Sequence, residues 1–163
     1  MKEEEGRYRF IGEVHSPFRE PEGTPIQPAA ARGVKGTVEL DPDYREGLKD
    51  LDGFSHIVLV YHFHMAKSGE LEASPFMDDK AHGVFATRSP ARPNPIGIST
   101  VRLKSVEGNT LHVENVDILD GTPVLDIKPH VSRFDQPEIN SEGWLDENVD
   151  KLETSRDDGR FAR

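Results

Sequence analysis

The chain has 163 residues, of which 34% are hydrophobic and none is cysteine, and its formal net charge is −10. This length predicts one domain followed by a tail. The lack of cysteine excludes disulfides, thiolate metal sites and cysteine nucleophiles, and the negative charge argues against non-specific binding to nucleic acid.

Two strands are predicted in the N-terminal region. Residues 7–15 read as a strand that places Tyr8, Phe10 and Val14 on one face. A loop rich in proline and glycine follows, and residues 36–40 form the second strand.

A short helix is predicted directly after the second strand. Asp41 is placed to act as its N-cap, and Pro42 suits the first helical position. The spacing i, i+4, i+7 gives the helix one apolar stripe, formed by Tyr44, Leu48 and Leu51.

The most continuous apolar run covers residues 54–64. Its β-branched content and its length predict a strand that is buried on both faces. The acidic loop of residues 65–82 is longer than a usual connection, which is typical of lids and partner-binding surfaces.

Residues 83–97, here called the central loop, form the most informative stretch. They are predicted to begin as a strand and then contain three prolines in six residues, which exclude both helix and regular strand pairing. Such a loop is stiff and extended, and it carries Arg88, Arg92 and Asn94, whose planar donors suit carboxylates, phosphates and base edges. A proline-stiffened surface loop with solvated arginines is the alternative.

The rest of the chain predicts a hairpin, one more strand and a tail. Residues 98–106 and 110–119 form two strands joined by a short turn, and after a tight turn at 120–123 residues 124–128 form the last strand. Residues 135–163 are acidic and thinly apolar, which predicts a tail with partial order.

Many short strands, one brief helix and no β-α-β alternation indicate a mainly β fold. The prediction is a small single-sheet β-barrel over residues 7–134, with one short helix and a partly ordered C-terminal tail over residues 135–163.

Charge is distributed unevenly along this predicted fold. Residues 80–106 contain no aspartate or glutamate, and their cations are Lys80, Arg88, Arg92, Arg102 and Lys104. Much of the acid lies in residues 3–5 and after residue 134. A basic middle in an acidic chain predicts a local anionic ligand rather than a long duplex. Without a signal peptide or an apolar run long enough to cross a membrane, the sequence predicts a cytoplasmic protein.

Polar groups in three separate turns could meet at one mouth of the barrel. These turns are residues 25–27, 63–64 and 120–123, although the last one is individually more typical of a plain turn. His62 and His64 would share a strand face, but the spacing supplies no third ligand, so no metal site is predicted. His64 is either a hydrogen-bonding group near a strand end or a buried, satisfied histidine. Nucleophile motifs and glycine-rich phosphate loops are absent from the sequence.

Four segments carry a resemblance to a known family. They are residues 11–18, 53–57, 83–97 and 117–129, and together with the intervening sequence from about residue 8 to 131 they resemble the TrmO (TsaA-like) family. The resemblance implies a small β-barrel, a homodimer, and S-adenosylmethionine-dependent methylation of N6 of threonylcarbamoyladenosine beside the tRNA anticodon.

The resemblance also implies site residues. Carried over by position, the cofactor contacts would be Pro25, Ile26, Gln27, Phe63, His64, Arg88, Ile98, Asp120, Gly121, Thr122 and Pro123. Arg92 and Asn94 would face the tRNA base or its backbone. The proton acceptor is not identified; His64 and Asp120 are candidates, and the sequence does not choose between them. Bacterial members often carry arginine where this chain has Ile26.

The predicted activity is therefore methyl transfer from S-adenosylmethionine to N6 of the modified adenosine at position 37 of tRNA, by a homodimer that binds the anticodon loop and no membrane. Two alternatives remain at this point. One is a dimeric, non-enzymatic module that binds a nucleotide-like ligand, and the other is a methyltransferase with a different acceptor.

Overall fold

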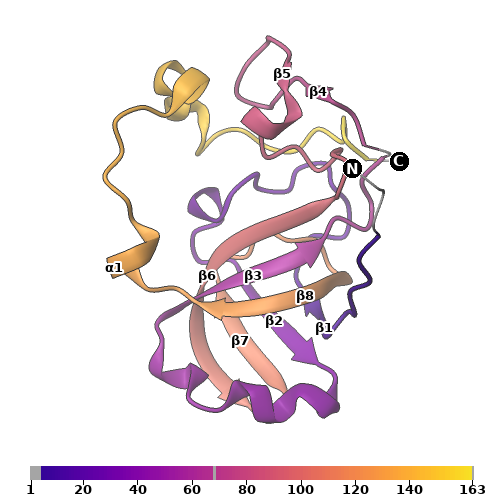
Figure 1. Ribbon diagram of the computed structural model, residues 1–163, viewed down its shortest axis with the longest axis vertical. Helices are drawn as coiled ribbons and strands as arrows, with labels where there is room; N and C mark the ends of the chain where they lie inside the picture. The colour runs from indigo at the N-terminus through magenta and orange to yellow at the C-terminus, as the bar shows by residue number, and fades with distance from the viewer. Residues whose placement is uncertain (1–4, 68, 163) are drawn as a thin grey trace.

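Six antiparallel strands close into a barrel in the computed structural model, which describes residues 5–67 and 69–162 (Figure 1). Most of the acidic N-terminal run, position 68 of the acidic loop and the last residue of the tail lie outside these ranges. The order around the barrel is β1-β2-β7-β6-β3-β8. The strands are β1 (Gly12–His15), β2 (Lys35–Leu40), β3 (His56–His62), β6 (Ile96–Glu107), β7 (Thr110–Glu114) and β8 (Thr122–Pro129). The predicted β-barrel is confirmed.

Alternating side chains fill the barrel. On β3, Ile57, Leu59 and Tyr61 are buried and point inward, while the residues between them are half-buried on the outer face. The expectation that this strand is buried on both faces is therefore wrong, because an antiparallel barrel covers only its interior.

The long strand β6 connects the two halves of the barrel. Its first half pairs with β3, from His62 opposite Ile96 to His56 opposite Arg102, and its second half pairs with β7. The predicted hairpin turn between β6 and β7 is confirmed, and Gly108 takes a φ of 64° there, which favours glycine.

The first strand is shorter than predicted. β1 begins at Gly12, and Tyr8 and Phe10 lie outside it with 82% and 55% of their surface exposed. Their alternation with polar residues imitates a strand, but the barrel already closes where β1 pairs with β8 and β2. β7 likewise ends at Glu114, five residues before the predicted end.

The predicted helix after β2 is a 3₁₀ helix, η2 (Pro42–Leu48), capped as expected by Asp41, whose carboxylate accepts from the Asp43 amide. A second short turn, η3 (Leu51–Gly53), follows a left-handed Asp50. The prediction of an α-helix with one apolar stripe is wrong, because a 3₁₀ helix repeats every three residues. Of the three residues predicted to form the stripe, Leu48 alone is buried.

The start of the central loop also differs from its prediction. A two-stranded sheet of β4 (Glu72–Ala73) and β5 (His82–Gly83) is followed by the 3₁₀ turn η4 (Val84–Ala86). Val84 is buried and Phe85 is 77% exposed, and the chain turns here instead of continuing as a strand.

The C-terminal segment returns to the barrel. It begins with α1 (Ser132–Asp135), which spans the predicted domain boundary, and then contains the turns η5 (Gly143–Glu147) and η6 (Val149–Lys151). One further turn, η1 (Pro28–Ala30), lies in the loop before β2. In Figure 1 the C-terminal segment, orange to yellow, runs back across the end of the molecule that carries β4 and β5. Isolated bridges join Pro25 to Arg156 and Ala66 to Ala162. Within the described ranges no helix is both long and apolar enough to cross a membrane.

Candidate functional site

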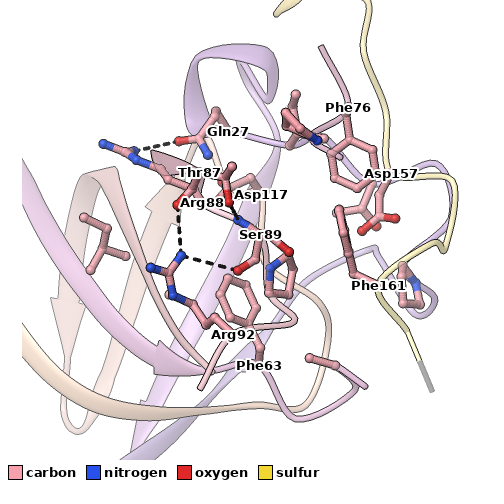
Figure 2. Close-up of a pocket in the computed structure, with 18 of the residues that line it drawn as sticks. Gln27, Phe63, Phe76, Thr87, Arg88, Ser89, Arg92, Asp117, Asp157 and Phe161 are labelled. Carbon is pink, nitrogen blue, oxygen red and sulfur yellow. Dashed lines mark hydrogen bonds between the residues drawn. The ribbon is translucent and has the colours of Figure 1, made fainter. Parts of the chain in front are cut away.

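A cavity of about 720 Å³ opens where the central loop, the loop around Gln27, the ends of β3 and β6, and the C-terminal segment meet (Figure 2). Most of its wall is apolar. Its charged and titratable lining residues include Tyr61, His64, Arg88, Arg92, Asp117 and Asp157. The barrel interior itself is packed with side chains, so the cavity lies beside the barrel.

The central loop is held by its own hydrogen bonds. Arg92 Nη1 donates to the carbonyls of Thr87 at 3.0 Å and Ser89 at 3.4 Å (Figure 2). The Thr87 hydroxyl donates to the Val84 carbonyl and accepts from the Ser89 amide. These bonds and the prolines fix the loop, and part of the donor capacity of Arg92 is used inside it.

Arg88 bonds to a different segment of the chain. Its Nη1 donates to Gln27 Oε1 at 2.9 Å, which joins two segments 61 positions apart in the sequence. The Arg88 side chain is exposed at the cavity wall, so its remaining donors are available to an anion.

An aromatic pair forms the wall nearest the barrel. The rings of Tyr61 and Phe63 meet edge to face with centroids 5.3 Å apart. This packing requires glycine at position 97, where a Cβ would lie 2.7 Å from Phe63 Cζ and closer still to the Tyr61 ring. Ile98 lines the cavity while keeping half of its surface exposed.

The opposite wall comes from the C-terminal segment. Phe161 is buried against Phe76, with ring centroids 5.1 Å apart, and the Arg160 guanidinium lies 5.0 Å from the Phe76 ring centre. Trp144 stacks on His82 and donates from Nε1 to the Ala86 carbonyl at 2.8 Å. The segment predicted as an acidic tail therefore closes one side of the cavity.

A hydrogen-bond chain runs from the barrel interior to the cavity. Ser99 Oγ donates to Asp117 Oδ1 at 2.6 Å, and Tyr61 Oη lies 2.9 Å from the same Ser99 Oγ. Since the single Ser99 proton is given to the carboxylate, Tyr61 is the donor in the second bond. Burial raises the pKa of Asp117 to about 7, against the lowering effects of Ser99 and Arg88. Burial also raises the pKa of Tyr61, which keeps its hydroxyl protonated.

His64 lies at the end of β3 with its Nδ1 3.4 Å from the hydroxyl of Thr122. Burial, and secondarily the charge of His62, lowers the pKa of its imidazole, so the ring is neutral near pH 7. Among the residues that the structure describes, no three histidine, aspartate or glutamate side chains are arranged to hold a metal ion.

Most of the sequence-predicted site residues line this one cavity. They are Pro25, Ile26, Gln27, Phe63, His64, Arg88, Arg92, Asn94, Ile98 and Thr122. Three others, Asp120, Gly121 and Pro123, do not line it. Asp120 instead accepts a hydrogen bond from the Ser16 amide at 3.1 Å, and Gly121 has a φ of 78° in a turn whose amide bonds to Val14.

Sequence reasoning missed two groups of lining residues. Asp117 stands between the buried residues Val116 and Ile118, and a lone carboxylate in an apolar run was the available signal. The C-terminal contribution gave a weaker signal, because its few apolar residues, such as Trp144 and Leu145, indicate that the segment can dock but form no periodic pattern that says where. The members of that second group are Trp144, Leu145, Val149, Leu152, Asp157, Phe161 and Ala162.

Comparison with known proteins gives consistent matches. The family model described as tRNA-methyltransferase O N-terminal domain matches residues 13–136. A probable S-adenosyl-L-methionine-binding protein of Pyrococcus abyssi is 60% identical over 94% of this chain and 84% of its own length. The human tRNA (adenine(37)-N6)-methyltransferase is 35% identical over 85% of this chain and 33% of its own length.

Solved structures agree with these matches. A crystal structure of TrmO from Pseudomonas aeruginosa is similar with a TM-score of 0.73 and 38% identity, over 86% of this chain. The match covers 63% of that protein, so the present chain spans less than two thirds of the solved relative and a third of the human one.

Proposed function

The chain belongs to the family described as tRNA-methyltransferase O N-terminal domain, and we propose on this premise that it transfers a methyl group from S-adenosylmethionine to N6 of threonylcarbamoyladenosine at position 37 of tRNA. The relatives named for S-adenosyl-L-methionine binding and for tRNA (adenine(37)-N6) methylation support this proposal.

One observation carries the cofactor assignment: a single mostly apolar cavity contains a cation with free donors beside an aromatic wall. Arg88, steadied by Gln27, would hold the cofactor's carboxylate. Phe63 and Ile98 would pack against its adenine. A cavity of about 720 Å³ is within the roughly 300–1,000 Å³ typical of small-molecule sites.

The tRNA would approach over the exposed side of the central loop. Asn94 and Phe85 are exposed there, and the surrounding residues 80–106 contain no acidic side chain. An anticodon loop is single-stranded, so its base can be splayed out, hydrogen-bonded by Asn94 and stacked on Phe85. Arg92 would act mainly by holding the loop in this shape, because its Nη1 already bonds to Thr87 and Ser89.

We also propose that the protein acts as a homodimer in the cytoplasm, where tRNA is modified. Ile96 and Ile98 line the cavity and are 41% and 50% exposed, and exposed apolar side chains at the edge of a site are typical of a subunit contact. A second copy at that edge would complete the closure of the cavity against water.

Positioning accounts for much of the proposed catalysis. The carbamoyl group makes N6 a poor nucleophile, and holding it in line with the methyl group can lower the barrier by roughly 7–11 kcal/mol. The same carbamoyl group makes the N6 proton more acidic, so transfer also needs a proton acceptor.

Labelled S-adenosylmethionine incubated with total tRNA tests the activity. Label should enter tRNA that carries the threonylcarbamoyl group and not tRNA lacking it. Label on neither tRNA would favour a non-enzymatic binding module, and label on a protein or small molecule would favour another acceptor; both results contradict the proposal.

Two variants test the assignment of the cavity. Arg88→Ala should lose cofactor binding by calorimetry, while Asn94→Ala should bind cofactor normally and lose turnover. Arg102→Ala, an exposed arginine on β6 that does not line the cavity, is the matched control and should behave as wild type. Normal cofactor binding by Arg88→Ala would show that the site is elsewhere.

A further inference from the structure

We propose that the carboxylate of Asp117 accepts the N6 proton during methyl transfer. This inference rests on the proposed function. It adds the proton acceptor, the one chemical role that the residues predicted from the sequence leave open. It assigns a catalytic residue that lies outside the predicted set of cofactor and tRNA contacts.

The cavity limits the choice of proton acceptor. Among its described lining residues, the side chains that can act as a base are His64, Asp117 and Asp157. Asp120, one of the two candidates from the sequence, does not line the cavity and bonds to the Ser16 amide. Asp157 lies by Phe76 and Phe161, whereas Asp117 lies near Arg88 and Thr87 of the central loop (Figure 2).

Asp117 is also held in a fixed orientation. Ser99 donates to its Oδ1 and is in turn held by Tyr61, so the carboxylate is anchored to two barrel strands, β6 and β3. Ser99 is 2% exposed and Tyr61 5% exposed, so both anchoring groups are rigidly packed. A positioned base on a rigid element is what proton transfer requires.

Its electrostatic surroundings suit this task. Burial raises the pKa of Asp117, and Ser99 from β6 and Arg88 from the central loop act against that rise; Tyr61 from β3, His64, Arg92 and Asp157 are the other titratable groups that line the cavity. Burial brings the pKa of Asp117 to about 7, where a base is largely ionised under mildly alkaline conditions and still basic enough to hold a proton. The pKa of His64 is shifted downward, which makes it the weaker base.

Methyl transfer forms one bond at the methyl carbon and breaks another. The N6 lone pair attacks the methyl carbon while the bond from that carbon to sulfur breaks, and the bonding electrons stay on sulfur to give S-adenosylhomocysteine. The N6 proton passes to the Asp117 carboxylate, and the protonated acid then releases it to solvent after the products leave. Because the base must start ionised, the rate should rise with pH and level off above about 7.

The test is the pH dependence of the single-turnover methylation rate with saturating cofactor and modified tRNA. Wild type should show one ionisation near pH 7. Asp117→Asn should keep cofactor affinity, lower the rate by about 10²-fold or more, and lose this ionisation. Ser99→Ala should move the ionisation to higher pH, because its bond lowers the pKa of Asp117.

Two controls separate the possible failures. Asp52→Asn, an exposed aspartate outside the cavity, should match wild type, and His64→Gln should keep the ionisation whatever its rate. An active wild type with an equally active Asp117→Asn, or an Asp117→Asn that no longer binds cofactor, overturns the inference alone. A wild type that labels no tRNA overturns the proposed function and this inference with it.

Discussion

The interior of the barrel and the wall of the cavity differ in what holds them together. The barrel is filled by Val14, Ile57, Val101 and Leu111, none of which has exposed surface. The cavity wall mixes apolar side chains with Arg88, Asp117 and Asp157, contributed by loops and the C-terminal segment. Changes in the barrel should therefore act on folding, while changes in the wall should act mainly on binding and turnover.

The largest expected effect is on the barrel. Leu59→Ala should lower the free energy of unfolding by about 2–5 kcal/mol, because it removes a fully buried side chain from the barrel interior. Chemical denaturation measures this loss. The matched control is Leu71→Ala, since Leu71 is 71% exposed and should contribute little. Equal losses in the two variants would mean that the barrel interior is not the main source of stability.

Gly97→Ala tests the boundary between the two regions. The added Cβ would collide with the rings of Tyr61 and Phe63, so the aromatic wall has to move. Cofactor affinity should fall about tenfold, the equivalent of one lost aromatic contact of roughly 1.4 kcal/mol. Gly53→Ala adds a Cβ with nothing within 4 Å and should bind normally in the same calorimetric titration. Unchanged affinity in Gly97→Ala would exclude the aromatic wall from the site.

The C-terminal wall should detach without unfolding the barrel. Phe161→Ala removes the buried ring that packs on Phe76, so amides in residues 143–162 should exchange hydrogen at least about tenfold faster while the barrel strands keep their protection. Phe134→Ala, which truncates a side chain that is 74% exposed, is the control. Faster exchange throughout the barrel would show that the two regions form one cooperative unit.

The last expected effect is a pH-dependent one at Asp117. The folded protein ionises this carboxyl only near pH 7, while the unfolded chain does so near 3.8, so wild type loses stability as pH rises between these values. Asp117→Asn lacks this loss, and its melting temperature relative to wild type should rise over that window and then level off. For a protein of this size, each kcal/mol of unfolding free energy corresponds to about 2–4 °C in melting temperature. If the difference in melting temperature between Asp117→Asn and wild type were the same at every pH, the raised pKa of Asp117 would be contradicted.

The barrel could be predicted from the sequence, because alternation at period two and turn residues report directly on strands with one buried face. The strands β2, β3, β6 and β8 and the turn at Gly108 followed from such patterns. Strands were wrongly predicted where the local sequence alternates as in a strand but the chain does not join the sheet. This occurs at Tyr8 and Phe10 before β1 and at Val84 in η4.

The cavity could be predicted only in part. Residues on the central loop and at the strand ends are recognisable because proline and arginine in a loop indicate a rigid binding surface. The contribution of Trp144 and Phe161 depends on the C-terminal segment folding back over the barrel, which no local pattern specifies. Asp117 was missed because its surroundings, the hydrogen bond from Ser99 and the nearby charge of Arg88, come from residues distant in sequence.

The proposed function requires the cofactor to occupy this cavity, and a crystal structure of the protein with S-adenosylhomocysteine is the most direct test of that. Electron density for the ligand should lie between Arg88 and the aromatic wall, with its carboxylate on Arg88 and its sulfur facing the side of the cavity that contains Asp117. Density for the same ligand at any other place on the molecule, with this cavity empty, would contradict the account.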